Sequence, residues 1–266
     1  MSHKPLIHFA HANGVPALVY SKLFDLLKDQ YDVIYTPTLG PDKRYPIDNG
    51  WESLSNQVID SIVQQAEGRK VIAVGHSLGA VLSLLASMKR PELFEQVIML
   101  DPPLIVGKAA FAMMLMKTFN PKMLDKITPA GLSAKRRDHW DSRAQAAELL
   151  RPKGFYQLFD ETCFQDYIKY ALMDDPVRGG VELTISRDDE VKIFRTNSTM
   201  YWLPMPKVQV PTVLVSGQDS PFIKQKLPQA IKKKLGIPFT VMQGGHMFPL
   251  EYPIETVELI KSLIQK

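Results

Sequence analysis

Short apolar runs rich in β-branched residues alternate along the chain with longer segments in which apolar residues recur at helical spacing. The clearest short runs are residues 70–75, 96–100 and 210–216, each of which ends in Gly or is followed by Gly or Asp, and they are typical of buried strands. Further strands are predicted at 4–10, 31–35 and 238–242, and helices at 16–28, 51–67, 78–88, 222–235 and 254–264. Strands separated by helices predict an α/β fold with a mainly parallel central sheet and helices on both faces.

Between residues 103 and 206 this alternation gives way to helical periodicity. Helices are predicted there at 107–119, 142–150 and 154–172. We therefore expect a core made of residues 1–102 and 207–266, with residues 103–206 forming a helical cap inserted after the strand that ends at Asp101. Open α/β sheets bind ligands at the carboxyl ends of their strands, so this cap is expected to cover the site.

Composition narrows the function classes. Hydrophobic residues make up 45% of the 266 residues and charged residues 23%, as in ordinary globular chains. The net charge of +4 comes from basic residues that are scattered except for short runs such as Lys232-Lys233-Lys234, and this pattern does not predict binding to nucleic acid. No run of 18 apolar residues predicts a membrane span. One cysteine and no Cys/His cluster predict a cytoplasmic protein without a metal or other cofactor, and its oligomeric state is left open.

The segment Gly75-His76-Ser77-Leu78-Gly79 matches the pattern G-x-S-x-G. It lies between a predicted strand and a predicted helix, as the strand-turn-helix nucleophile elbow requires. The turn must expose the serine hydroxyl on a strained backbone, and the two flanking glycines provide the room. The pattern and its context together predict Ser77 as a nucleophile.

A nucleophilic serine needs a base, and His246 is the best candidate. It lies in a loop after the last predicted strand and follows Gly244 and Gly245, which allow the loop to turn the imidazole toward the elbow. Its position after Ser77 in the chain is the order found in this kind of architecture.

The elbow, the early loop His11-Ala12-Asn13-Gly14 and the segment Gly244-Gly245-His246 together resemble the α/β-hydrolase superfamily over essentially the whole chain. In its esterases the early loop carries a His-Gly pair and donates one oxyanion-hole amide, whereas this sequence has Ala12 in place of the glycine. The resemblance implies the backbone amides of Asn13 and Leu78 as oxyanion donors. We also expect His11 to contact the substrate.

Two carboxylates are candidates for the acid that orients His246. Asp219 follows the penultimate strand, where most members of the superfamily place the acid, but their usual Gly-x-x-Asp is Gly217-x-x-Ser220 here. Asp101 ends the strand after the elbow, and Asp101-Pro-Pro resembles a branch of small-molecule esterases and thioesterase-like hydrolases with the acid at that position. We favour Asp101 and keep Asp219 as the alternative.

These residues predict a serine hydrolase that cleaves carboxylic esters of small molecules through an acyl-enzyme. Thioesterase, lactonase and carbon–carbon bond hydrolase activities use the same three residue types, and a non-catalytic ligand-binding member of the fold is a further alternative. In the predicted cap, the Met-rich helix over 107–119 contains Met113 and Met116. Methionine side chains suit a pocket for varied apolar groups, so both are predicted to bind substrate.

Overall fold

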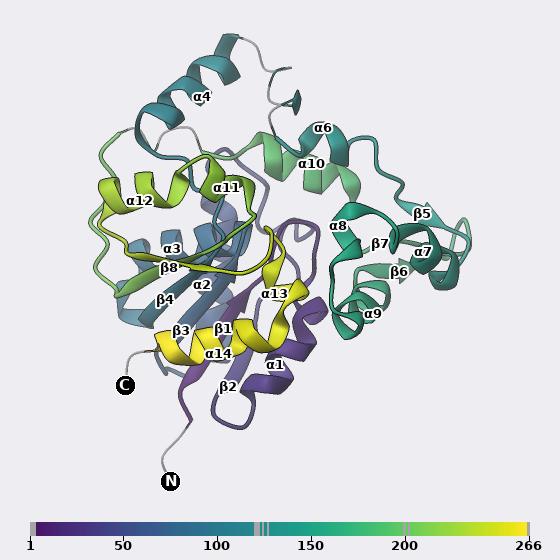
Figure 1. Cartoon of the computed structure of the whole chain (residues 1–266), viewed down its shortest axis with the longest axis horizontal. Coiled ribbons are helices and arrows are strands. Elements are labelled where there is room, and N and C mark those ends of the chain that lie inside the picture. Colours follow the sequence, from purple (N-terminus) through teal and green to yellow (C-terminus); the bar gives the residue numbers. More distant parts are fainter. Residues whose placement is uncertain are drawn as a thin grey trace.

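The computed structural model describes residues 4–119, 123, 125, 126, 128–198, 201 and 203–264. At its centre lies a six-stranded sheet with the order β2-β1-β3-β4-β8-β9, in which all neighbouring strands are parallel (Figure 1). The strands are β1 (Leu6–Ala10), β2 (Asp32–Tyr35), β3 (Val71–His76), β4 (Phe94–Leu100), β8 (Thr212–Gly217) and β9 (Phe239–Met242). The predicted α/β class with a mainly parallel sheet is confirmed.

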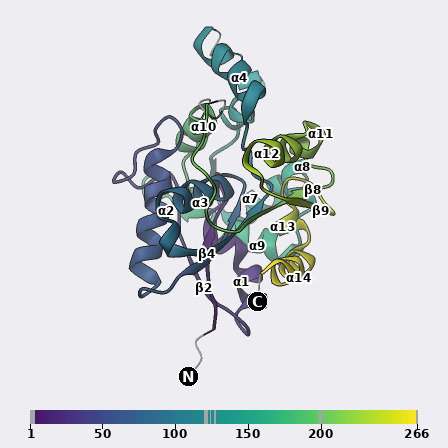
Figure 2. The same cartoon turned by 90° about the vertical axis from the view of Figure 1, so that its left-hand side faces the viewer.

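Helices cover both faces of this sheet, as the sequence predicts. Alternate residues of the central strands belong to two separate buried clusters, Ile72 and Val74 to one and Val71 and Ala73 to the other. Figure 2 shows α2 and α3 on one side of the sheet and α1 and α14 on the other. The helices outside the segment between β4 and β8 are η1 (Ala17–Tyr20), α1 (Ser21–Leu27), α2 (Glu52–Gln65), α3 (Leu78–Lys89), η2 (Pro91–Leu93), α11 (Pro221–Lys224), α12 (Leu227–Leu235), α13 (Phe248–Glu251) and α14 (Pro253–Leu263).

The segment between β4 and β8, called the insertion below, contains strands as well as helices. Its helices include α4 (Gly107–Phe119), α6 (Ala130–Ser133), α7 (Arg143–Leu150), α8 (Gly154–Gln157), α9 (Glu161–Tyr170) and α10 (Arg187–Arg195). An antiparallel sheet with the order β5-β7-β6 joins β5 (His139–Trp140), β7 (Val181–Leu183) and β6 (Leu172–Asp174). The sequence predicts helices in this segment but none of these three strands. Strands of two or three residues are too short to show a period in the sequence.

One long predicted helix is also interrupted. The sequence predicts a helix over residues 154–172, whereas the structure ends α8 at Gln157 and begins α9 at Glu161. Asp160 separates them, because its carboxylate accepts hydrogen bonds from the backbone amides of Thr162 and Cys163 and so caps the start of α9. The apolar spacing continues across Asp160, which explains why periodicity alone did not predict the break between α8 and α9.

The part of the insertion from α6 to α10 is held against the core at two places. The backbone amide of Asp160 donates to the carbonyl oxygen of Leu250 at 2.8 Å, and the Asp160 carboxylate pairs with Lys22 at 2.8 Å. On the other side, the Trp51 indole donates to the carbonyl oxygen of Ile193 on α10 at 3.1 Å. These contacts fix this part of the insertion relative to the central sheet.

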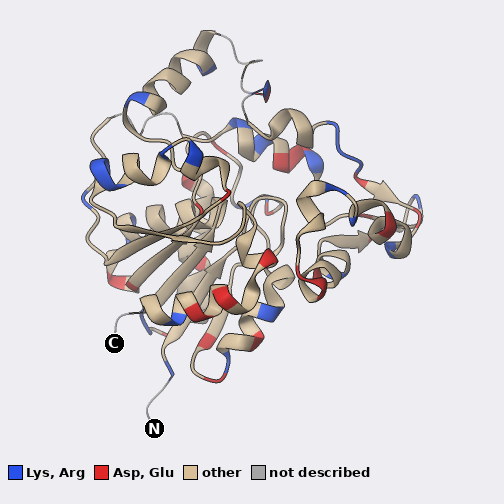
Figure 3. Cartoon of the chain, in the orientation of Figure 1, with Lys and Arg blue, Asp and Glu red and all other residues tan. Residues whose placement is uncertain are grey.

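The helices α4, α11 and α12 lie in the upper half of Figures 1 and 2, as does α10, and the charged residues of α4, α11 and α12 are of one sign. They carry lysines and no Asp or Glu (Figure 3), whereas α1 and α14 carry both signs. Within the described residues, every helix is too short or too polar to cross a bilayer.

Candidate active site

Ser77 lies on the sharp turn between β3 and α3, with φ 53° and ψ −115°, a strained conformation for a residue other than glycine. A Cβ at Gly75 would lie 2.4 Å from the carbonyl oxygen of Gly79, and a Cβ at Gly79 would lie 2.0 Å from the carbonyl oxygen of Ala10. Since no side chain fits at either position, both glycines are needed for the turn to pack against β1 and α3. The structure thus has the geometry that the G-x-S-x-G pattern requires.

Three of the predicted side chains form a hydrogen-bonded line. The Oγ of Ser77 lies 3.0 Å from Nε2 of His246, and Nδ1 of His246 lies 2.6 Å from Oδ2 of Asp101. Because a carboxylate only accepts hydrogen bonds, the Nδ1 atom carries the proton and Nε2 is left to accept the proton of the Ser77 hydroxyl. Ser77 is 8% exposed and Asp101 is fully buried. This arrangement is suited to removing a proton from Ser77.

Of the two predicted acids, the structure brings Asp101 to His246. The Asp101 carboxylate also accepts from the hydroxyl of Ser216 at 2.7 Å, from the amide of Gly217 at 3.1 Å and from the hydroxyl of Ser220 at 2.5 Å. Asp219 is exposed, and its backbone amide donates to the carbonyl oxygen of Gly244 at 2.9 Å. Ser220, at the usual acid position of the sequence motif, therefore points toward Asp101 and helps to hold its charge.

The loop that carries His246 is fixed by its glycines and by a half-buried carboxylate. Gly244 has φ 100°, which favours glycine, and a Cβ at Gly217 would lie 2.2 Å from the carbonyl oxygen of Gly245. The carboxylate of Glu251, on α13, accepts from the amide of Gly245 at 2.8 Å. Burial raises the pKa of Glu251. Glu251 was not predicted as a site residue, since nothing in its local sequence indicates this contact.

Two buried side chains, His76 and Tyr20, hold the backbone of His246 in place. The Nε2 atom of His76 donates to the backbone carbonyl oxygen of His246 at 2.9 Å, and the hydroxyl of Tyr20 donates to Nδ1 of His76 at 2.7 Å. Burial lowers the pKa of His76 to about 3, so this ring is neutral and donates through one nitrogen only. Nothing in the local sequence predicts the role of Tyr20, which lies 56 residues from His76 in the chain.

The early loop lies directly beside the elbow. The amide of Gly79 donates to the carbonyl oxygen of His11 at 3.1 Å, which holds the loop next to the first turn of α3. The side-chain amide of Asn13 donates to the carbonyl oxygen of Glu190 on α10 at 3.0 Å. These contacts bring Asn13 and Leu78 to the same end of the sheet as Ser77. Their backbone amides as oxyanion donors remain a prediction.

His11 differs from its prediction as a substrate contact. Its side chain is fully buried, Nδ1 donates to the carbonyl oxygen of Ala12 at 2.8 Å, and Nε2 accepts from the amide of Leu39 at 2.8 Å. Burial lowers its pKa to about 4. Since both ring nitrogens bind backbone groups, His11 shapes the loop and has no polar atom left for a substrate.

Met113 and Met116 lie half-buried on α4, which stands off from the sheet in Figures 1 and 2. Their role in binding a substrate remains a prediction. Among the described residues, no group of three or more His, Cys, Asp or Glu side chains is arranged to hold a metal ion. The acidic run Asp188-Asp189-Glu190 instead begins α10, where negative charge favours the helix.

A buried polar cluster that the sequence did not indicate joins α6, α9 and α10 beside the early loop. The Glu190 carboxylate accepts from the Ser133 hydroxyl at 2.7 Å and from the Arg136 guanidinium at 2.6 Å. Arg136 also donates to the hydroxyl of Tyr167 at 3.2 Å. A Cβ at Gly14 would lie 3.0 Å from Glu190, so the cluster packs directly on the loop that contains Asn13.

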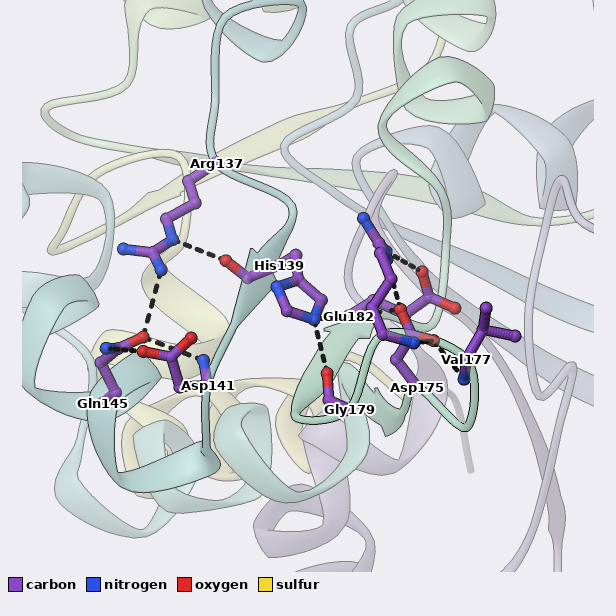
Figure 4. Close-up of polar contacts among 9 residues, drawn as sticks. Arg137, His139, Asp141, Gln145, Asp175, Val177, Gly179 and Glu182 are labelled. Carbon is purple, nitrogen blue, oxygen red and sulfur yellow. Dashed lines mark hydrogen bonds and ion pairs between the residues drawn. The ribbon is translucent and has the colours of Figure 1, made fainter.

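Another polar cluster ties the small sheet of the insertion together (Figure 4). His139 donates to the carbonyl oxygen of Gly179 at 2.7 Å, and Asp175 accepts from the amides of Val177 and Arg178, both at 2.9 Å. These bonds and the Arg178 guanidinium lower the pKa of Asp175 to about 2. The contacts join the turn between β6 and β7 to β5, and they give this cluster a structural role.

Comparisons with known proteins agree with this architecture. A model of the family described as "Alpha/beta hydrolase family" matches residues 9–259. An uncharacterized hydrolase of Bacillus subtilis (strain 168) is 33% identical over 87 residues, and the match spans 32% of this chain and 32% of that relative.

Two solved structures are similar over nearly the whole chain. E-2-(acetamidomethylene)succinate hydrolase has a TM-score of 0.76 and 21% identity, with 98% of this chain and 91% of that chain covered. The thioesterase domain from the curacin biosynthetic pathway has a TM-score of 0.72 and 21% identity, with 97% and 91% covered. At this level of identity, the likeness shows a shared fold.

Proposed function

We propose that this chain, which belongs to the α/β-hydrolase family, is a serine hydrolase that cleaves carboxylic esters of small molecules. Membership in this family and the similarity to a relative named as a hydrolase support the proposal that the protein is an enzyme. The observation that carries the proposal is the hydrogen-bonded line from Ser77 through His246 to Asp101. A serine with a purely structural role would not need a strained backbone, an imidazole nitrogen within hydrogen-bond distance and a carboxylate that orients the imidazole.

In the proposed reaction, the Ser77 oxygen attacks the ester carbonyl while Nε2 of His246 takes the hydroxyl proton. The carboxylate of Asp101 stabilises the imidazolium ion that forms. His246 then returns the proton to the departing alkoxide, which leaves as an alcohol, and the acyl group remains on Ser77. Water, activated by the same imidazole, attacks the acyl-enzyme and releases a carboxylic acid. Each proton lost by a nucleophile is thus given to a leaving group.

The tetrahedral intermediate carries a negative oxygen that must be stabilised. We assign this role to the backbone amides of Asn13 and Leu78, since the Gly79 contact to His11 holds the two segments together. One such donor in a dry site contributes about 2.7–4 kcal/mol to lowering the barrier. Leu78 begins α3, so the positive end of that helix adds to the same effect.

The same machinery serves thioesters, lactones and activated carbon–carbon bonds, and the similarity to a thioesterase domain makes thioesters the second candidate. Asp101-Pro-Pro resembles a branch that contains both small-molecule esterases and thioesterase-like hydrolases, so the order of the two candidates is decided by experiment. A panel of p-nitrophenyl esters and matched acyl thioesters of increasing acyl length separates the two. Faster turnover of the thioester at every length would reverse the order of these candidates.

A fluorophosphonate probe tests the proposed nucleophile. We expect labelling of the wild-type protein, none of Ser77→Ala and full labelling of Ser83→Ala, which removes a buried hydroxyl from the helix after the elbow. A wild-type protein that is not labelled, although a cooperative unfolding transition shows that it is folded, would contradict the proposal that the protein is a serine hydrolase. It would favour the non-catalytic ligand-binding alternative.

A further inference from the structure

Helix α4 turns apolar side chains outward. Leu115 is 40% exposed and Phe119 is 81% exposed, and Phe111, 41% exposed, lies one turn before Leu115 on the same helix face. On the other side of the helix, Lys117 is half-buried and donates to the side chain of Asn49 at 2.8 Å. A surface helix ordinarily buries its apolar stripe and exposes its charges, whereas α4 exposes three large apolar side chains and half-buries one of its two lysines.

Three helices on this side of the molecule, α4, α11 and α12, carry basic residues and no acidic ones. The sequence contains no Asp or Glu in residues 102–119, nor in residues 220–250 that form α11, α12 and β9. Figures 1 and 2 place α4 on the same side of the molecule as α11 and α12, and Figure 3 shows only lysines among the charges of these three helices. The exposed lysines there are Lys108, Lys224, Lys226, Lys232, Lys233 and Lys234.

We propose that α4, with the lysines of α11 and α12, docks the protein on an anionic lipid surface. An apolar stripe of Phe and Leu on one helix, flanked by lysines, is the composition of helices that lie in the interface of a bilayer. The lysines are attracted by anionic headgroups, and Leu115 and Phe119 reach the boundary of the acyl chains. The proposal concerns binding alone and does not depend on the proposed ester hydrolysis.

A second copy of the chain fits this surface less well. An isologous dimer through α4 would bring two identical surfaces together. Both surfaces carry lysines without a single acidic residue in the segments that form them, so the two copies repel each other. An anionic lipid surface supplies the missing negative charge and an apolar phase at the same time.

Vesicle sedimentation tests the proposal with the full chain. We expect binding to vesicles of equal parts phosphatidylcholine and phosphatidylglycerol, and little binding to vesicles of phosphatidylcholine alone. The double variant Leu115→Gln/Phe119→Gln should lose about tenfold or more of the affinity, since two apolar side chains no longer enter the lipid. Lys232→Gln should lose about fivefold, and added salt should weaken wild-type binding.

The matched control is Val63→Gln/Ile254→Gln, which removes two apolar residues that are 52% and 54% exposed on α2 and α14. It should bind the mixed vesicles like the wild type. All variants should hydrolyse a short, water-soluble ester at the wild-type rate, because none of the changed residues belongs to the candidate active site.

Three results would overturn the proposal. The first is equal binding of the wild type to both kinds of vesicle, or to neither. The second is unchanged vesicle binding by Leu115→Gln/Phe119→Gln. The third is a dimer, seen by sedimentation equilibrium without lipid, that is lost in the same double variant, because a second copy would then cover α4.

Discussion

Two regions that follow each other in the chain, the end of β4 and helix α4, are built in opposite ways. Asp101 is fully buried and accepts hydrogen bonds from three segments of the chain, including the loop of His246. In α4, which the structure describes throughout, Ala110 alone is buried. The contrast suggests that reaction geometry depends on many mutually supporting contacts, whereas α4 tolerates substitution. The predictions below test this difference.

The largest effect on activity is expected at Asp101, which follows the buried strand β4. Asp101→Asn should keep the fold but lower ester turnover by up to about 10⁴-fold, because an amide no longer fixes the tautomer of His246 or stabilises its cation. Asp219→Asn, at the exposed alternative acid, should stay close to wild type. Steady-state kinetics of both variants decide the matter. A severe loss in Asp219→Asn with Asp101→Asn nearly silent would overturn the proposed role of Asp101.

Acid should destabilise the buried core strongly. Burial lowers the pKa of His8 and His76 to about 3 and that of His11 to about 4, against 6.5 for each in the unfolded chain. Between about pH 5.5 and 4.5, the unfolded state therefore binds about three more protons than the folded state. The stability contributed by these neutral rings is complete above pH 6.5 and is lost as the pH falls. The expected slope is about 4 kcal/mol per pH unit.

Urea unfolding between pH 6.5 and 4.5 measures this slope. Carboxylates contribute to it as well, so the informative quantity is the difference between the wild type and His8→Asn. The variant should lose about a third of the histidine contribution, or about 1.4 kcal/mol per pH unit. An identical slope in both proteins would show that His8 takes up its proton in the folded state.

The tight packing of the elbow gives the next effect. Gly79→Ala places a methyl group 2.0 Å from the carbonyl oxygen of Ala10, so the backbone must shift, at a cost of about 1–3 kcal/mol. Gly154→Ala is the matched control, because its Cβ meets no atom within 4 Å. Thermal unfolding should separate the two variants. Equal stabilities would mean that the elbow can relax around a side chain.

A smaller effect on activity is expected at Tyr20, which contacts His246 through His76. Tyr20→Phe removes the hydroxyl that fixes the tautomer of His76, so the bond from His76 to the His246 carbonyl weakens. We expect kcat to fall about tenfold with KM unchanged, which corresponds to a rise of about 1.4 kcal/mol in the activation free energy. Tyr45→Phe, which removes a hydroxyl bonded to Asp60, serves as the control. A fall in stability without a change in kcat would assign Tyr20 a purely structural role.

The smallest effect on stability is expected in α4. Met113→Ala/Met116→Ala should change the preferred acyl length in the ester panel while the unfolding free energy stays nearly constant, because both side chains are only half-buried. Denaturant unfolding and the ester panel measure the two quantities. A loss of about 2–5 kcal/mol for each methionine, as in a packed core, with acyl preference unchanged would contradict the predicted substrate contact.

Much of the fold and part of the candidate site could be predicted from the sequence, because the signals are local. The strand 71–76, the turn at Ser77 and the helix from Leu78 follow one another within a few residues, and small residues are needed only next to the serine. The short strands β5, β6 and β7 could not be predicted in this way. Each forms only because distant segments pair, and none is long enough to show a period.

The choice between the two carboxylates shows what local patterns cannot determine. Both Asp101 and Asp219 follow strands, and the sequence alone leaves both as candidates for contact with His246. In the sheet, β4 lies next to β8, so the hydroxyls of Ser216 and Ser220 reach the Asp101 carboxylate from the neighbouring strand and the loop after it. Asp219 is left at the surface.

The sequence by itself thus determined the order of the strands and helices of the core, the elbow at Ser77 and the loop position of His246, since each depends on spacing within one segment. Only the tertiary structure decided that Asp101 meets His246, that Tyr20 stands behind His76, and that His11 is occupied by backbone groups. These contacts join residues from separate segments, and a hydrogen bond requires a distance of about 3 Å that only the packing of the sheet and its loops can set.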